Sequence, residues 1–376
     1  MIHSFFIEHS YLIGLVSFLI GWLGMPIVVR IAKAKGFVVR PNKRMSHTGA
    51  VPNIGGLNIY FSVMLSYLLF DYNQIANNQF FLIGVAAIMA IGFIDDVLVL
   101  TPLAKLLGET LAGIALIGFG DLRITHLHGI LGINEISVIP SYLISLFILI
   151  AIINAINLID GIDGLASGLG ILYCLFFAVY FHLVGSNDWS ILAICMIGAL
   201  AVFFIYNVFG NREKIFMGDS GSLLLGYLLT AFVFRFCEQN AYHLVPEQFH
   251  MSAAPAVAIC VLTVPIFDTI RVSLTRIKHH CSPFQPDKNH IHHLLLRTGL
   301  NHIQTTCVLL SVSVLFIALA VLGRNWNMWV LLFCDFAIAT TLTLILWRVL
   351  NKKIANDPYG VADRMSKANK EMVHKC

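Results

Sequence analysis

The sequence predicts an all-α, polytopic integral membrane protein, and three observations lead to this fold class. The chain of 376 residues is 58% hydrophobic and only 12% charged, whereas a soluble domain has roughly 25% charged residues. Apolar runs of about 20 residues recur along the chain, and each is long enough to cross a hydrocarbon core as a helix. Basic residues gather in alternate connections between these runs. A membrane barrel is excluded, because its strands alternate apolar and polar residues.

Apolar runs between polar or turn-forming breaks define eleven predicted spans. The first, 11–32, has no positively charged region before it and no small-residue cleavage site, so we expect a retained helix rather than a signal peptide. The other ten spans follow at 55–72, 79–94, 102–119, 139–159, 163–184, 189–209, 220–236, 252–271, 303–323 and 327–349.

The basic residues orient the spans. If the connection after the first span is cytoplasmic, 21 of the 24 Lys and Arg residues fall on that face, and only Arg123, Arg235 and Arg324 fall opposite. The positive-inside rule then places the N-terminus outside and the C-terminus in the cytoplasm. We predict one transmembrane domain over 1–350 and a basic cytoplasmic tail over 351–376. The cytoplasmic loops are expected at 33–54, 95–101, 160–163, 210–219 and 272–302.

Two adjacent carboxylates, Asp95 and Asp96, follow the third span at its inner end. Carboxylates beside hydrocarbon are costly unless they bind a cation or a basic partner. Mg²⁺ is such a cation, since it takes one or two carboxylates together with water and phosphate. A solvated pair of acids at a helix end is the alternative. Lys105, one span later, either pairs with Glu109 one turn on or reaches a phosphate beside Asp96.

The connection after the fifth span reads Asn154-Ala-Ile-Asn157-Leu-Ile-Asp160-Gly-Ile-Asp163-Gly. Asn154, Asn157 and Asp160 recur every third residue, so they share one face if the segment is helical. The two glycines let the backbone approach a ligand closely. Asx-Gly turns are also common in ordinary loops, but their position between two apolar spans favours a binding site.

The segment Phe216-Met-Gly-Asp219-Ser-Gly-Ser leads directly into the eighth span. Backbone N–H groups and the positive dipole at a helix start favour a phosphate, which Asp219 is expected to bridge through a metal. The alternative for Asp219 is a plain N-cap. Phe216 either stacks on a base or anchors the loop at the bilayer surface.

Three histidines lie within four residues in the last long cytoplasmic loop, Ser282-Pro-Phe-Gln-Pro-Asp-Lys-Asn-His290-Ile-His292-His293, shortly after Arg271 and Arg276. Such a group suits a diphosphate through charge-assisted hydrogen bonds, or proton transfer near neutral pH. Zinc is the competing interpretation, although the nearby sequence offers only Cys281 and no HExxH helix.

One acid, Asp335, lies in the middle of the last span. Ionisable residues within a membrane indicate function by default. Because Asp335 belongs to no motif, we expect it to form a hydrogen bond between helices instead.

Taken in order, the motifs DD, NxxNLxDGxDGL, FMGDSGS and SPFxPDxxHIHH resemble those of the bacterial polyprenyl-phosphate N-acetylhexosamine-1-phosphate transferase family. The resemblance extends over residues 26–300. The HIHH form after PDKN is similar to the branch of glycosyltransferase family 4 that loads N-acetylglucosamine onto undecaprenyl phosphate. Within the same superfamily, the phospho-N-acetylmuramoyl-pentapeptide transferases are the alternative branch.

The resemblance implies a reaction at the cytoplasmic face of the bacterial inner membrane. N-acetylhexosamine-1-phosphate passes from a UDP-sugar, with UDP-N-acetylglucosamine preferred, to undecaprenyl phosphate, and UMP leaves. This would be the initiating step of a cell-envelope polysaccharide such as lipopolysaccharide O antigen. Direct attack by the lipid phosphate is favoured, because a phosphate monoester is largely ionised at pH 7. A covalent phosphosugar intermediate stays open.

By the same resemblance, the cofactor is Mg²⁺, with Mn²⁺ as an alternative. The implied metal ligands are Asp219, Asp95 and Asp96, and the implied catalytic residues are these three with His292 and His293. Uracil would be held by Asp163 and Phe216, and the nucleotide and metal pocket lined by Asn157, Asp160 and Asn207. The diphosphate or sugar would contact Lys105, Arg276 and His290.

The expected partners are the UDP-N-acetylhexosamine, undecaprenyl phosphate and membrane lipid, with no nucleic acid, and a homodimer is an open assembly. A membrane transporter is the functional alternative from another class. Transport sites usually lie near the membrane midplane on broken helices of repeated halves. The polar motifs here lie on one face, and the sequence shows no convincing internal repeat.

Overall fold

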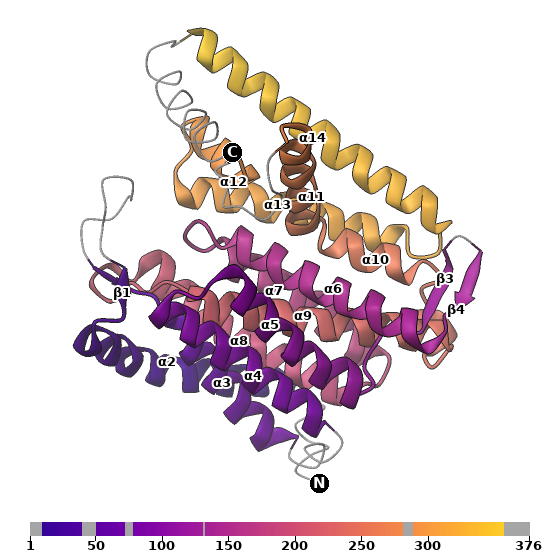
Figure 1. The fold of residues 1–376 in the computed structure, drawn as a ribbon, viewed down its shortest axis with the longest axis horizontal. Coiled ribbons are helices and arrows are strands. Elements are labelled where there is room, and N and C mark those ends of the chain that lie inside the picture. Colours follow the sequence, from indigo (N-terminus) through magenta and orange to yellow (C-terminus); the bar gives the residue numbers. More distant parts are fainter. Residues whose placement is uncertain (1–9, 40–49, 72–77, 131, 281–288, 357–376) are drawn as a thin grey trace.

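The computed structural model describes residues 10–39, 50–71, 78–130, 132–280 and 289–356 (Figure 1). Parts of two predicted loops, 40–49 and 281–288, and most of the predicted basic tail, 357–376, lie outside these residues. The strands in the described ranges form two short antiparallel pairs. β1 (Val38–Val39) pairs with β2 (Val51–Pro52), and β3 (His126–Ile130) pairs with β4 (Ile133–Glu135).

Helices form nearly all the rest, which confirms the all-α class. They are α2 (Ser10–Lys35), α3 (Gly55–Phe70), α4 (Gln79–Leu98), α5 (Pro102–Gly113), the π-helical η2 (Ile114–Phe119), α6 (Val138–Ile159), α7 (Leu165–Leu183), α8 (Asn187–Phe209), η3 (Asn211–Glu213), α9 (Gly218–Ala241), η4 (Glu247–Phe249), α10 (Ala254–Val261), α11 (Thr263–Lys278), α12 (Ile291–Arg297), α13 (His302–Leu322) and α14 (Met328–Asn356).

Each of the eleven predicted spans falls on one of these helices or helix pairs. Nine helices in the described ranges are long and apolar enough to cross a membrane, and α3 is a shorter apolar helix. The polytopic membrane class is therefore confirmed, while the number of crossings and their orientation stay predictions. The span predicted at 252–271 is not one straight helix, because α10 and α11 meet at an angle of 81°.

Two helices extend beyond the bounds predicted for their spans. Residues 95–101 were expected to form a loop, but α4 continues to Leu98, so Asp95 and Asp96 lie in its last turn. This turn is held because Oδ1 of Asp95 accepts a hydrogen bond from the backbone N–H of Leu100 (2.6 Å). At the other end of the chain, α14 runs to Asn356 and includes the start of the predicted tail.

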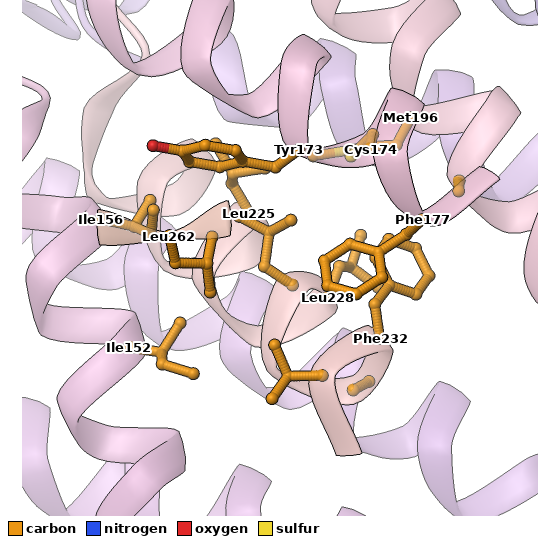
Figure 2. Packing of buried hydrophobic residues seen from close by; sticks show 14 of the residues in the cluster. Ile152, Ile156, Tyr173, Cys174, Phe177, Met196, Leu225, Leu228, Phe232 and Leu262 are labelled. Atoms are coloured by element: carbon orange, nitrogen blue, oxygen red, sulfur yellow. The ribbon is translucent and has the colours of Figure 1, made fainter. Parts of the chain in front are cut away.

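Helix α9 is the centre of the bundle. Of an 18-residue apolar stretch of α9, 94% is buried inside the protein, whereas 28% of the corresponding stretch of α2 is buried. Figure 2 shows Leu225, Leu228 and Phe232 of α9 beside side chains of α6, α7 and α8. Close helix packing drives association where lipid is as apolar as the side chains. Because α9 begins with the Gly-Asp-Ser-Gly motif, its central place also fixes where that motif lies.

Small residues let α4 approach the start of α9. A Cβ added to Gly92 would lie 2.5 Å from Cα of Ser220, which real side chains do not tolerate. The last turn of α4 is therefore held directly beside the first turn of α9. In Figure 1, β1 and α12 lie at one end of the bundle and the β3–β4 hairpin at the opposite end.

Candidate active site

The carboxylate of Asp96 caps the start of α9 from the neighbouring helix. Its Oδ1 accepts a hydrogen bond from the N–H of Asp219 (2.7 Å), and its Oδ2 accepts one from the N–H of Ser220 (3.0 Å). A helix start carries unpaired N–H groups and a partial positive charge, so a carboxylate there is favourable. These N–H groups were expected to meet a phosphate, but Asp96 supplies the anion instead.

Gly218 makes this cap sterically feasible. Its φ of +71° lies in the left-handed region, which glycine adopts without the penalty that a Cβ brings. A Cβ at this position would also lie 2.5 Å from Oδ2 of Asp96. The two residues of the Gly-Asp pair therefore differ in role. Gly218 leaves room for the Asp96 carboxylate, and the side chain of Asp219 is free to contact other helices.

Side chains from four helices meet at Asp219. Its Oδ1 lies 2.5 Å from Nζ of Lys105 on α5 and accepts a hydrogen bond of 2.6 Å from Nδ2 of Asn157 on α6. The same Lys105 ammonium lies 3.3 Å from Oδ2 of Asp95 on α4. Two carboxylates and one amide therefore surround a single positive charge. The structure brings together four residues that the sequence analysis singled out separately.

Of the two alternatives for Lys105, pairing with Glu109 is not the one that the structure shows. Glu109 is 1% exposed, and its Oε2 accepts a hydrogen bond from Nδ2 of Asn154 (2.8 Å). Lys105 points instead to the carboxylates at the end of the bundle. The Asn154–Glu109 hydrogen bond thus joins α6 to α5 about one helical turn before Asn157.

Asp160 lies just past the end of α6, close to the carboxylates of Asp219, Asp96 and Asp163. Burial, together with the nearby charges of Asp219, Asp96 and Asp163, raises the pKa of Asp160 to about 7. A group of acids that repel one another is stabilised when a cation enters.

The donor set suits Mg²⁺ in its usual protein environment. Among the residues that the structure describes, no three Asp, Glu, His or Cys side chains are already arranged around a common metal position. Mg²⁺ does not need three, because it commonly takes one or two carboxylates and completes its shell with water and phosphate. Asp95 and Asp219 already converge on one cation, the ammonium of Lys105.

Asp163, predicted to hold uracil, is bound to two basic side chains. Its Oδ2 lies 2.7 Å from Nζ of Lys214 and 3.0 Å from Nδ1 of His302. Burial alone would raise the pKa of Asp163, but the hydrogen bonds from His302 and Lys214 outweigh it and lower the pKa below its ordinary value. Lys214 also lies over the ring of Phe216, 5.7 Å from its centroid. Asp163 and Phe216 are thus neighbours, joined by Lys214.

Asn207, expected to line the nucleotide pocket, holds two loops together. Its Oδ1 accepts a hydrogen bond from the N–H of Gly164 (2.6 Å), and its Nδ2 donates to the carbonyl of Ile215 (2.8 Å). The side chain is buried. In this arrangement Asn207 positions the Asp160–Asp163 loop against the segment that leads into α9.

The histidine motif is anchored to α11 by Asp268, which the sequence analysis missed. Asp268 Oδ2 lies 2.9 Å from Nδ1 of His290, and both carboxylate oxygens accept the N–H of Ile291 (3.0 and 3.1 Å). Arg271 completes the group, since its guanidinium lies 2.6 Å from Asp268 Oδ1. Arg276, on the same helix, is also buried.

His292 brings this motif against the Asp160–Asp163 loop. A Cβ added to Gly161 would lie 2.3 Å from Nε2 of His292, so the two residues are in close contact. His292 is 1% exposed, and neither ring nitrogen has a hydrogen-bond partner among the described residues. Burial lowers the pKa of His292 to about 3, so the ring is neutral near pH 7. The ring of His293 follows, with centroids 4.2 Å apart.

Lys214, Asp268 and His302 are the site residues that the sequence analysis did not find. Lys214 and His302 lie in short polar segments, 211–214 and 301–304, and no motif spacing links them to Asp163. Asp268 carried the strongest available signal, because an acid within a predicted apolar span has to find a partner.

The fold and the site together define the class of this protein, a polytopic membrane protein with acidic, lysine, asparagine and histidine side chains converging at one end of its helices. The family model for glycosyl transferase family 4 matches residues 78–236, which include three of the four motifs.

Similar proteins cover most of the chain. The undecaprenyl-phosphate alpha-N-acetylglucosaminyl 1-phosphate transferase of Pasteurella multocida (strain Pm70) is 30% identical over 336 residues, 86% of this chain and 89% of that protein. The protein of the same name from Haemophilus influenzae is 29% identical over 343 residues, 89% of this chain and 94% of that protein. The chain belongs to glycosyl transferase family 4, as the motifs predicted.

Proposed function

We propose that this protein transfers N-acetylglucosamine-1-phosphate from UDP-N-acetylglucosamine to undecaprenyl phosphate. The names of its relatives support both the acceptor lipid and the sugar. The observation that carries the proposal is the convergence of Asp95, Lys105, Asn157 and Asp219 from four helices. Such a site, at the ends of apolar helices, suits a reaction between a membrane lipid and a water-soluble nucleotide.

In this reaction, an oxygen of the lipid phosphate attacks the phosphorus that carries the sugar. A new P–O bond forms, and the bond from that phosphorus to the bridging oxygen breaks. The electron pair leaves with UMP, so the products are undecaprenyl-diphosphate-N-acetylglucosamine and UMP. The attacking phosphate needs little activation, because a phosphate monoester is largely ionised at pH 7.

Lys105 supports direct attack rather than a covalent intermediate. Its ammonium is shared by Asp95 and Asp219, and a carboxylate that is paired with a cation is a weaker nucleophile. When the substrates bind, the same ammonium can neutralise developing negative charge on the phosphates.

Mg²⁺ is proposed as the cofactor, with Mn²⁺ as its alternative. Asp95 and Asp219 are the residues that would hold it, and when bound the metal would neutralise the diphosphate. Asp96 orients Asp219 through the cap on α9. Each Asp96 oxygen keeps a second lone pair, and its role as a metal ligand stays a prediction.

His292 and its neighbours are proposed to contact the diphosphate or the sugar. Neither ring nitrogen of His292 has a hydrogen-bond partner in the part of the chain that the structure describes, which supports this role, since buried polar atoms are nearly always hydrogen-bonded. Asp163, Lys214 and Phe216 are proposed to hold the uridine. The basic face of the chain supports an active site that opens to the cytoplasm, in the inner membrane of a bacterium.

A donor panel tests the proposal. Purified protein is incubated with undecaprenyl phosphate, Mg²⁺ and one UDP-sugar at a time, including UDP-N-acetylmuramoyl-pentapeptide, and UMP is measured. We expect UMP with UDP-N-acetylglucosamine and none with the pentapeptide donor. UMP with the pentapeptide donor alone would assign the chain to the other branch. No UMP with any donor from folded protein would refute the transferase.

A further inference from the structure

A carboxyl group within the membrane lies at the bend between α10 and α11. Asp335 of α14 is completely buried, and its Oδ1 lies 2.8 Å from Oγ1 of Thr263, the first residue of α11. The thiol of Cys260, on α10, lies against the same carboxyl. The helix-to-helix hydrogen bond expected for Asp335 is therefore confirmed, and residues on both sides of the bend share it.

The regular pattern of backbone hydrogen bonds changes at the bend, where the N–H of Leu262 bonds to the carbonyls of Ala258 (3.2 Å) and Ile259 (3.0 Å). Pro265 has no N–H, so the regular hydrogen-bond ladder cannot pass through this region. Thr263 Oγ1 lies 2.9 Å from the carbonyl oxygen of Cys260 and 3.1 Å from that of Ile259. The threonine hydroxyl therefore serves the end of α10 as well as Asp335.

Counting protons shows which form of the carboxyl fits. A threonine hydroxyl carries one proton and can donate once. When that proton goes to a carbonyl of α10, the contact with Asp335 needs a proton on the carboxyl group. An ionised Asp335 would also lack a counter-charge, because no ion pair within the described ranges includes it. Its Oδ2 has no hydrogen-bond partner there either, and an isolated buried charge is costly.

We propose that Asp335 is protonated and donates a hydrogen bond to the hydroxyl of Thr263. This bond fixes the direction in which α11 leaves the bend. The hydrogen bonds then run from α14 through Thr263 to the last carbonyls of α10. In this state the carboxyl of Asp335 donates to the hydroxyl of Thr263, and that hydroxyl donates to a carbonyl of α10.

The direction of α11 matters because this helix carries the anchor of the histidine motif. Asp268 lies five residues after Thr263, about 7.5 Å along the helix at 1.5 Å per residue. A change of about 10° at the bend would move Asp268 by roughly 1 Å, and a misplacement of that size can cost about 100-fold in rate. Asp335 is thus a positioning residue for His290 and His292, a role that rests on the proposed function.

Infrared spectroscopy tests the protonation without any substrate. The wild-type spectrum minus that of Asp335→Asn should contain the C=O band of one carboxylic acid. The band should shift in Thr263→Val, because the acid loses its hydrogen-bond acceptor. A carboxylate band in the difference spectrum, or no change in Thr263→Val, would overturn the proposal.

Kinetics test the positioning. Asn has the shape of a protonated Asp and can donate to Thr263, so Asp335→Asn should keep kcat/KM within about twofold. Asp335→Leu, which suits the membrane but cannot bond, should lose about tenfold or more with an unfolding temperature no lower than that of Asp335→Asn. Thr263→Val should show the same loss and Thr263→Ser should not.

Thr343→Val is the matched control, since among the described residues the hydroxyl of Thr343 on α14 bonds within its own helix, to the carbonyl of Ala339. Full activity in both Asp335→Leu and Thr263→Val would refute the positioning role. If the wild type released no UMP, the proposed function would fail, and the infrared result would still decide the hydrogen bond.

Discussion

The ammonium group of Lys105 lies 2.5 Å from Oδ1 of Asp219, although 114 residues separate the two in sequence. The same ammonium lies 3.3 Å from Asp95. Helix packing at the end of the bundle thus builds one electrostatic unit from three helices.

Replacing Lys105 by Met should reduce kcat/KM by about 100-fold or more. The change removes the charge that faces the phosphates and leaves Asp95 and Asp219 without their cation. The measurement is UMP release at saturating lipid. Lys278→Met, which removes an exposed lysine at the end of α11, is the control, and equal activities of the two variants would contradict the role of Lys105.

Replacing Asp96 by Ala should destabilise the protein by about 1–2 kcal/mol, because two N–H groups at the start of α9 lose their acceptor. Asp96→Asn should be intermediate, since the amide offers one acceptor oxygen and no charge. Denaturant or thermal unfolding in detergent provides the measurement. Wild-type stability in Asp96→Ala would show that the cap contributes nothing.

The Asp163 ion pairs should make stability depend on pH. Because the folded-state pKa of Asp163 is lowered, its contribution is present above the unfolded pKa of about 3.9 and is lost as pH falls through the lower folded pKa. The double variant Lys214→Met/His302→Gln should be less stable than the wild type by about 1–3 kcal/mol at pH 7.

As the pH falls through the lowered folded-state pKa of Asp163 and its carboxylate becomes protonated, this difference should shrink. Unfolding temperatures across this range provide the comparison. A difference that stays constant between neutral and acidic pH would mean that Asp163 is not the partner through which the two basic residues act.

Replacing Gly161 by Ala should reduce kcat/KM by about tenfold or more while the protein stays folded. The new methyl group would overlap Nε2 of His292, 2.3 Å away, and push the histidine motif from the Asp160–Asp163 loop. Gly118→Ala is a matched control, because its Cβ would meet nothing closer than 3.6 Å. Equal activity of the two alanine variants would remove His292 from the site.

Much of the fold was predictable from the sequence, because apolar length alone marks helices in a membrane. The bend at Leu262 was not, since the residues next to it on both sides, 254–261 and 263–267, are mostly apolar. Pro265 was the available signal, but many transmembrane helices contain a proline without breaking.

The candidate site residues could be singled out from the sequence, but their contacts could not. Asp95, Asp96 and Asp219 stood out as acids beside apolar runs, yet only the structure shows that Asp96 caps α9 while Asp95 and Asp219 share Lys105. Adjacent residues of a helix point in different directions, so two neighbouring carboxylates can serve different partners. Asp268 and His302 act through tertiary contacts that no local pattern encodes.

The most direct test of the transferase is a balance of its two products. Purified protein is given UDP-N-acetylglucosamine and Mg²⁺, with or without undecaprenyl phosphate, and UMP and the lipid-linked sugar diphosphate are both counted. We predict one lipid product for each UMP, no UMP without the lipid, and neither product from Asp219→Asn. UMP release that does not need the lipid, or full turnover by Asp219→Asn, would contradict the account.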